Sequence, residues 1–176
     1  MIFTTTPIGA VVIEPERLAD ARGFFARAFC AREFEARGLN PHVAQCNVSF
    51  NARRGTLRGM HFQHAPHTEA KLVRCTAGAV HAVALDIRPG SPSFRRHFAI
   101  ELSAENRKML YVPEGVAHGF QTLVDGAEVF YQISTPHAPG HEGGVRWNDP
   151  AFGIAWPLPV TTIAERDAGY PDFQAT

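Results

Sequence analysis

The sequence predicts an all-β fold of the jelly-roll type, in which the strands close off most sheet edges. Fifteen glycines and thirteen prolines interrupt short apolar runs, which is typical of many strands joined by turns. Several runs alternate apolar and polar residues, and only one segment has the pattern of a helix. The length of 176 residues indicates a single domain, 1–176, with one core.

The expected elements follow one another along the chain and end in an irregular C-terminal segment from Pro136 onward. The single predicted helix is short, "AREFEARGL" (31–39), and ends at Gly38. The expected strands lie in the segments 11–15, 23–29, 42–51, 55–63, 71–88 with a turn at Ala77-Gly78, 94–102, 108–124 and 127–134. A jelly roll built from them tapers, and its mouth forms a natural pocket for a small ligand.

Composition excludes several classes of protein. The formal net charge is zero, so we expect neither a nucleic-acid-binding surface nor a membrane-binding one. Three cysteines, Cys30, Cys46 and Cys75, are widely spaced and predict free thiols in a reducing compartment. No apolar run approaches the ~20 residues that cross a bilayer, and the N-terminus lacks the basic start of a signal peptide. We therefore expect a cytoplasmic protein.

The segment "RGTLRGMHFQ" (54–63) combines strand character with several charged or titratable side chains. In a regular strand Arg58 and His61 point to opposite faces, because side chains alternate. Gly59 lies between them, and a glycine inside a strand often marks a bulge that re-aims a side chain. The sequence therefore predicts a bulge near Gly59 that lets both side chains reach one cavity.

The turn "PEGVAHGF" (113–120) presents His118 at the start of a strand and resembles the second motif of cupin barrels. In many cupins that histidine binds a metal. The His-x-His of the first cupin motif is absent here. A metal site built from His61, His64, Glu69 and His118 is the alternative, since mixed nitrogen and oxygen ligands suit several divalent ions.

Three further polar residues could contribute to such a pocket. Tyr131 lies among apolar residues of "AEVFYQIS" and shares a face with Val129. Lys71 opens a strand. Asp167, in "AERDAGYP", can reach the barrel only if the tail folds back over its mouth.

Taken together, these motifs resemble the dTDP-4-dehydrorhamnose 3,5-epimerase family over nearly the whole chain and in order. The segments that carry the resemblance are "DARGFF", "QCNVSF", "RGTLRGMHFQ", "KLVRCTAGAV", "LDIRPGSPSF", "LYVPEGVAHGFQTL", "VFYQIS", "VRWNDPAFGIAWPL" and "AERD". The resemblance implies a cupin-type barrel that needs no metal or cofactor. It also implies a homodimer that exchanges N-terminal strands, and a nucleotide-diphosphate 4-keto-6-deoxyhexose as substrate in deoxysugar biosynthesis.

The resemblance also implies the catalytic roles. His61 takes a proton from C3 or C5 of the sugar, Asp167 orients His61, and Tyr131 returns a proton from the other side of the ring. Lys71 and His118 stabilise the enolate oxygen. The chemistry agrees, since a neutral histidine suits proton abstraction near neutral pH and a developing enolate needs a nearby donor or cation.

Further residues are implied to bind the substrate. Arg58, with Arg22 of the partner chain, contacts the diphosphate, because a guanidinium fork binds two oxygens at once. Gln45 and Asn47 line the pocket.

Three positions depart from the family pattern. Arg27 stands where a glutamate is frequent, Ala82 where an aspartate is usual, and His137 where an aromatic residue stacks on the base. Arg27 and His137 predict a different nucleotide or sugar end. Ala82 removes a carboxylate expected to support the pocket near His118. Two other functions stay open: a metal-dependent cupin enzyme, and a catalytically silent sugar-nucleotide-binding barrel.

Overall fold

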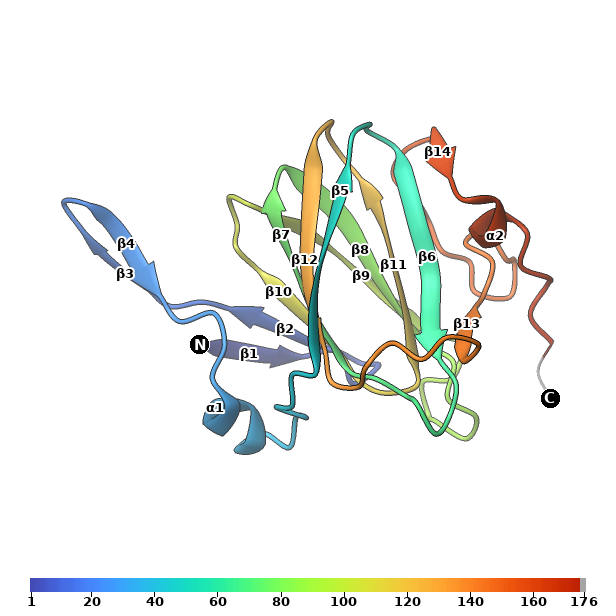
Figure 1. Ribbon diagram of the computed structural model, residues 1–176, viewed down its shortest axis with the longest axis horizontal. Helices are drawn as coiled ribbons and strands as arrows, with labels where there is room; N and C mark the ends of the chain where they lie inside the picture. Colours follow the sequence, from blue (N-terminus) through green and yellow to red (C-terminus); the bar gives the residue numbers. More distant parts are fainter. Residues whose placement is uncertain (175–176) are drawn as a thin grey trace.

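Two antiparallel β-sheets pack face to face in the computed structural model, which describes residues 1–174 (Figure 1). The first sheet has the order β1-β2-β10-β7-β12-β5. The second has the order β13-β6-β11-β8-β9, with β14 parallel to β6. Strands β3 and β4 form a separate hairpin. The predicted all-β fold is confirmed, and the two sheets are consistent with a jelly roll.

The strands are short, and their bounds are β1 Ile2–Thr5, β2 Val11–Glu14, β3 Arg17–Asp20, β4 Gly23–Ala26, β5 Gln45–Asn51, β6 Thr56–Gln63, β7 Lys71–Ala77, β8 Ala79–Asp86, β9 His97–Ser103, β10 Met109–Val112, β11 Val116–Thr122, β12 Ala127–Ile133, β13 Glu142–Gly144 and β14 Thr162–Ile163. The two helices are α1 (Ala31–Glu35) and α2 (Glu165–Ala168). Neither helix is long and apolar enough to span a membrane, in the part of the chain that the structure describes.

The predicted helix is shorter than expected. Helix α1 ends at Glu35, and a turn carries the chain to Gly38, whose φ of 68° suits a glycine. The backbone N–H of Leu39 donates to the carbonyl of Phe34, which closes the helix end. Strands β13 and β14 and helix α2, in the segment expected to be irregular, have two to four residues each, too few to give a periodic pattern.

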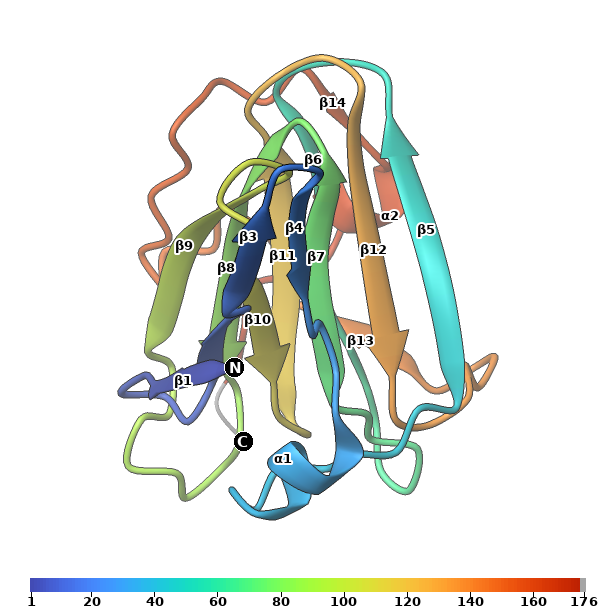
Figure 2. The same cartoon turned by 90° about the vertical axis from the view of Figure 1, so that its left-hand side faces the viewer.

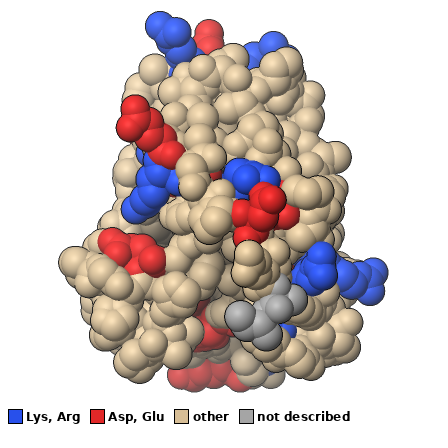
Figure 3. All heavy atoms as spheres, turned by 90° about the vertical axis from the view of Figure 1, so that its right-hand side faces the viewer, with Lys and Arg blue, Asp and Glu red and all other residues tan. Residues whose placement is uncertain are grey.

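The second sheet is buried on both faces. Its inner face packs against the first sheet, with Ala82 and Phe120 in the shared core. Its outer face carries Met60 and Leu85, which pack against C-terminal residues that include Trp156. Figure 3 views the side on which the C-terminal segment lies and shows few charged residues, of both signs. The tail therefore folds back over the outer face of the second sheet.

The β3–β4 hairpin projects away from the two sheets (Figures 1 and 2). Its side chains Leu18 and Phe25 are 68% and 69% exposed. Large apolar side chains on a projecting hairpin are typical of a segment that packs on another chain.

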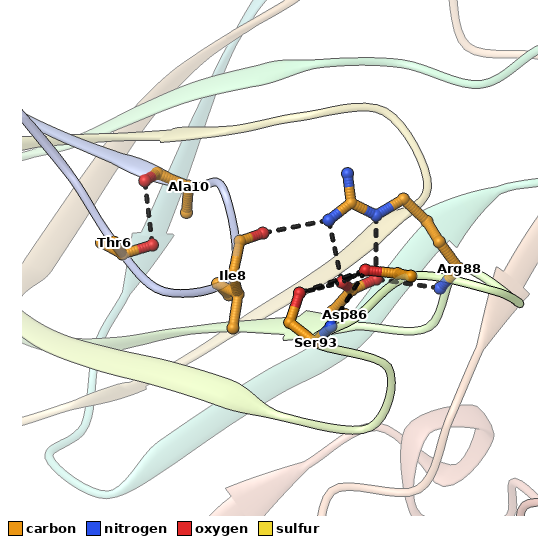
Figure 4. Close-up of polar contacts among 7 residues, drawn as sticks. Thr6, Ile8, Ala10, Asp86, Arg88 and Ser93 are labelled. Carbon is orange, nitrogen blue, oxygen red and sulfur yellow. Dashed lines mark hydrogen bonds and ion pairs between the residues drawn. The ribbon is translucent and has the colours of Figure 1, made fainter.

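A buried carboxylate fixes the end of β8 to the N-terminal turn (Figure 4). Asp86, fully buried, accepts hydrogen bonds from the Arg88 guanidinium at 2.8 Å and from the hydroxyls of Ser91 and Ser93 at 2.5 and 2.6 Å. Arg88 also donates to the carbonyl of Ile8 at 3.0 Å. Burial by itself would raise the pKa of Asp86, but these hydrogen bonds outweigh it and hold the pKa well below the ordinary 3.8.

We expect Asp86→Asn to lower the free energy of unfolding by about 3 kcal/mol at pH 7, because it leaves Arg88 without its charged partner. Because the pKa is lowered in the folded state, the Asp86 carboxylate stabilises the fold above pH 3.8, the ordinary carboxyl pKa, and loses this effect as the pH falls further. Urea unfolding at equal protein concentration checks both points, and the difference from wild type should shrink in acid. As a control, Asp172→Asn removes the exposed partner of Arg146 and should cost roughly 0.5 kcal/mol. An equal loss for both variants would contradict the role of Asp86.

Candidate active site

A cavity of about 460 Å³ opens between the two sheets. Its lining contains polar side chains from both sheets and a few apolar ones. The residues are Gln45, Asn47, Ser49, Arg58, His61, Phe62, Gln63, Glu69, Lys71, His118, Phe120, Tyr131, Ile133, His137, Glu142, Gly143 and Arg166. Eight of the eleven predicted site residues are among them.

A bulge in β6 brings two predicted side chains to this cavity. His61 pairs with His118 and Arg58 with Phe120, so three steps on β6 match two on β11. The extra residue lies in the stretch Gly59–Met60, and it allows Arg58 and His61 to line the same cavity. The bulge predicted from the sequence is confirmed.

Two glycines permit this geometry. Gly59 has a φ of 126°, a conformation that L side chains rarely adopt, and a Cβ there would lie 2.5 Å from the Cα of Gly119. A Cβ on Gly119 would lie 2.6 Å from the Met60 sulfur. The backbones of β6 and β11 therefore approach each other closely at the bulge, and side chains at these two positions would separate them.

The His61 imidazole is oriented from the C-terminal helix. Its Nε2 is 2.8 Å from Oδ1 of Asp167, while the other carboxylate oxygen accepts a hydrogen bond from the Gly59 N–H at 3.0 Å. Burial by itself would raise the pKa of Asp167, but these two hydrogen bonds outweigh it and lower the pKa, so the group is a carboxylate. A carboxylate on Nε2 favours the tautomer with the proton there, which leaves Nδ1 with a lone pair.

Tyr131 reaches the cavity from the opposite sheet. It lies on β12 of the first sheet, whereas His61 lies on β6 of the second, so the two side chains line the cavity from different sheets. Burial, with a smaller contribution from the charge of Glu69, raises the pKa of Tyr131 although Arg58 acts in the opposite direction. At neutral pH the phenol is therefore protonated and able to donate.

A lysine, a carboxylate and a histidine lie together in the cavity. The ammonium of Lys71 donates a short hydrogen bond to Oε1 of Glu69 and lies 3.5 Å from the carbonyl of His61. Burial lowers the pKa of Lys71, although Glu69 acts in the opposite direction. Burial, together with the charges of Lys71 and His61, lowers the pKa of His118 to about 3, so its imidazole is neutral.

Polar and cationic groups line other parts of the cavity. Arg58 donates to Oδ1 of Asn51 at 2.7 Å, which holds the guanidinium in place. Gln45 donates to Asn47 at 3.0 Å and accepts from the backbone N–H of His137 at 3.1 Å.

Three predicted residues do not line the cavity of this chain: Asp167, which contacts the cavity residue His61, and Arg22 and Arg27. Arg22 lies at the tip of the β3–β4 hairpin and pairs with Asp20. Arg27 follows that hairpin and pairs with Glu33 at 3.1 Å. The hairpin projects away from the two sheets (Figure 1), and neither arginine lines the cavity.

The alternative metal site does not assemble. Among the described residues, no three His, Cys, Asp or Glu side chains converge closely enough to hold an ion. His64 instead packs edge-on against Phe62 with ring centroids 4.9 Å apart, and it does not line the cavity. Ala82 lies in the core and pairs with the cavity residue Phe120, while His118, two residues away on β11, pairs with Ala84.

Sequence reasoning missed several cavity residues. Glu69 was considered only as a metal ligand, and Arg166 was not considered, although it stands beside Asp167 in "AERD". Ser49 shares the alternation of Gln45 and Asn47 along β5, a signal that could have identified it.

Comparison with known proteins identifies the family of this chain. The dTDP-4-dehydrorhamnose 3,5-epimerase family matches residues 5–175. The chain is 41% identical over 174 residues to the dTDP-4-dehydrorhamnose 3,5-epimerase of Salmonella typhimurium, covering 97% of this chain and 94% of that protein. Both matches confirm the resemblance seen in the motifs.

Solved structures give the same result. The dTDP-4-dehydrorhamnose 3,5-epimerase of Elizabethkingia anophelis superposes with a TM-score of 0.95 at 38% identity, covering 98% of this chain and 96% of that one. A 3'-monoepimerase from Streptomyces bikiniensis in complex with dTDP-quinovose gives a TM-score of 0.88 at 34% identity, covering 96% and 86%. The chain therefore belongs to the dTDP-4-dehydrorhamnose 3,5-epimerase family, and its class is that of the isomerases.

Proposed function

We propose that this protein epimerises a dTDP-linked 4-keto-6-deoxyhexose at C3, C5 or both, through an enolate. The observation that carries the proposal is the hydrogen-bonded pair of His61 and Asp167 on one side of the cavity, with Tyr131 on the other. Inversion of a carbon needs an acid and a base on opposite faces of the ring, and this cavity offers one of each.

His61 acts as the base. The 4-keto group acidifies the protons at C3 and C5, and the free Nδ1 of the imidazole accepts one of them. The Asp167 carboxylate stabilises the imidazolium that forms, while Gly59 holds the carboxylate in place.

Lys71 and His118 stabilise the enolate. Electron density from the broken C–H bond moves to the 4-keto oxygen, which then needs donors close by. Lys71 supplies an ammonium and His118 a neutral imidazole, and both are buried where such interactions are strong. Tyr131 then protonates the carbon from the opposite face.

The nucleotide diphosphate binds at the cationic part of the cavity. Arg58 and Arg166 supply guanidinium groups to the diphosphate, and Gln45 and Asn47 supply amides. His137, about half exposed, replaces the aromatic residue expected to stack on the base. The cavity needs no metal or cofactor for this chemistry.

The protein forms a homodimer in which the β3–β4 hairpin reaches the partner. Strand β5 supports this because its outward side chains are apolar: Val48 and Phe50 are each 60% exposed. A second copy covering this face buries them, and its hairpin places Arg22 and Arg27 near the cavity.

The experiment is to incubate the protein in deuterium oxide with dTDP-4-keto-6-deoxyglucose generated in place, and to follow C3 and C5 by NMR. Inverted product with deuterium at both carbons establishes a 3,5-epimerase, and inversion with deuterium at one carbon establishes a monoepimerase. If neither carbon exchanges, GDP- and CDP-linked 4-keto sugars test whether Arg27 and His137 select another nucleotide. Binding without exchange for all three would contradict the proposal and support a silent binding barrel.

A further inference from the structure

Buried polar atoms without a partner gather in the cavity. The described residues contain five side-chain nitrogen or oxygen atoms that are buried and make no hydrogen bond. Three belong to residues that line the cavity: Oγ of Ser49, Oε2 of Glu69 and Nε2 of His118. Such atoms are costly in a folded protein, and at a binding site the ligand satisfies them.

Glu69 is the most constrained of the three. It lies two residues before the first residue of β7. Ala70, between Glu69 and β7, is held by two hydrogen bonds: its N–H donates to the Ser134 hydroxyl at 2.8 Å, and its carbonyl accepts from the Ser134 N–H at 3.0 Å. Glu69 and Lys71 are two residues apart in this extended backbone, so both side chains point into the cavity. The side chain of Glu69 is only 5% exposed.

The two carboxylate oxygens of Glu69 have different surroundings. Oε1 accepts the hydrogen bond from Lys71, whereas Oε2 has no partner. An ionised carboxylate only accepts hydrogen bonds, so the group that satisfies Oε2 must be a donor. In a dTDP-linked 4-keto-6-deoxyhexose the phosphates and the ketone are acceptors and C6 has no hydroxyl. The donors of the hexose are the hydroxyls on C2 and C3, whereas the remaining donors, thymine N3–H and the 3'-hydroxyl of deoxyribose, belong to the nucleoside end.

We propose that Glu69 binds the C3 hydroxyl of the sugar through Oε2 while Oε1 holds Lys71 against the 4-keto oxygen. The inference rests on the proposed function. An acceptor and a donor side by side match an α-hydroxyketone, in which a hydroxyl donor adjoins a carbonyl acceptor.

The test compares the binding of the whole sugar nucleotide with the binding of the nucleotide alone. Calorimetry measures the dissociation constants of dTDP and of dTDP-4-keto-6-deoxyglucose in the His61→Asn background, where turnover does not interfere, with and without Glu69→Gln. Lys71 takes the single oxygen of the glutamine amide, so the hydroxyl loses its charged acceptor and keeps only a weaker bond from the amide NH₂ to the hydroxyl oxygen. The affinity for the keto sugar nucleotide should fall about tenfold. The affinity for dTDP, which has no sugar at this end, should stay within about twofold. As the control, Glu101→Gln on β9 should change neither.

The outcomes are distinct. An unchanged affinity for both ligands would overturn the inference, because Glu69 would then make no contact with the sugar. An equal loss for both would also overturn it, because Glu69 would then only support the pocket. If the His61→Asn protein with Glu69 unchanged binds neither ligand, the result would instead count against the proposed function.

Discussion

Replacing His61 by asparagine is expected to lower the epimerisation rate by about 10³-fold, because an amide cannot accept the proton from the sugar. Asparagine is close in shape to part of the imidazole, so the cavity should still bind the sugar nucleotide. The measurements are the steady-state rate of product formation and the rate at which deuterium from the solvent enters C3 and C5, each compared with wild type.

A matched control shows that the effect belongs to this imidazole. His97→Asn changes a histidine on β9 that does not line the cavity, and it should leave the rate unchanged. A rate for His61→Asn within a few-fold of wild type would show that another group is the base.

Replacing Asp167 by asparagine is expected to lower the rate by roughly 10³-fold with the fold intact. The amide oxygen can still accept from the Gly59 N–H, but its NH₂ then donates to Nε2 of His61. This reverses the tautomer and places the proton on Nδ1, where the lone pair is needed. The pH dependence of kcat/KM should change with it, because the imidazolium also loses its anionic partner.

Glu165→Gln is the matched control on the same helix. Glu165 is an exposed neighbour in α2, so the variant should retain the wild-type rate. Equal loss of activity in both variants would indicate that the helix itself, and not the orientation of His61, is disturbed.

The local sequence pattern was enough to predict the all-β fold and several residues of the cavity. Odd spacing between Arg58 and His61, with Gly59 between them, indicated the bulge because alternation otherwise sends the two side chains to opposite faces. Gln45 and Asn47 share one face of β5 through the same alternation. The apolar residues on both faces of β8 were not interpreted from the sequence, and the structure explains them because the tail covers the outer face.

The remaining features of the site depend on tertiary contacts, which the sequence pattern does not show. Helix α2 has four residues, too few to show a helical period, so the sequence could not place Asp167 on it. The contact of Asp167 with His61 spans 106 residues of chain, which only the folded-back tail brings together. The pairing of Glu69 with Lys71 was missed for a different reason. Their spacing is that of any two residues on one strand face, and only burial gives the pair its significance.

The most direct test of the account is to separate proton exchange from inversion with Tyr131→Phe. The wild-type protein in deuterium oxide should give inverted product that carries deuterium. In the variant His61 still removes the proton, so the recovered 4-keto sugar should gain deuterium at the carbon that the wild-type protein inverts. The amount of inverted product should fall by about 10²-fold. Inversion at the wild-type rate in the variant would contradict the account, because the acid on the second face of the ring would then be another group.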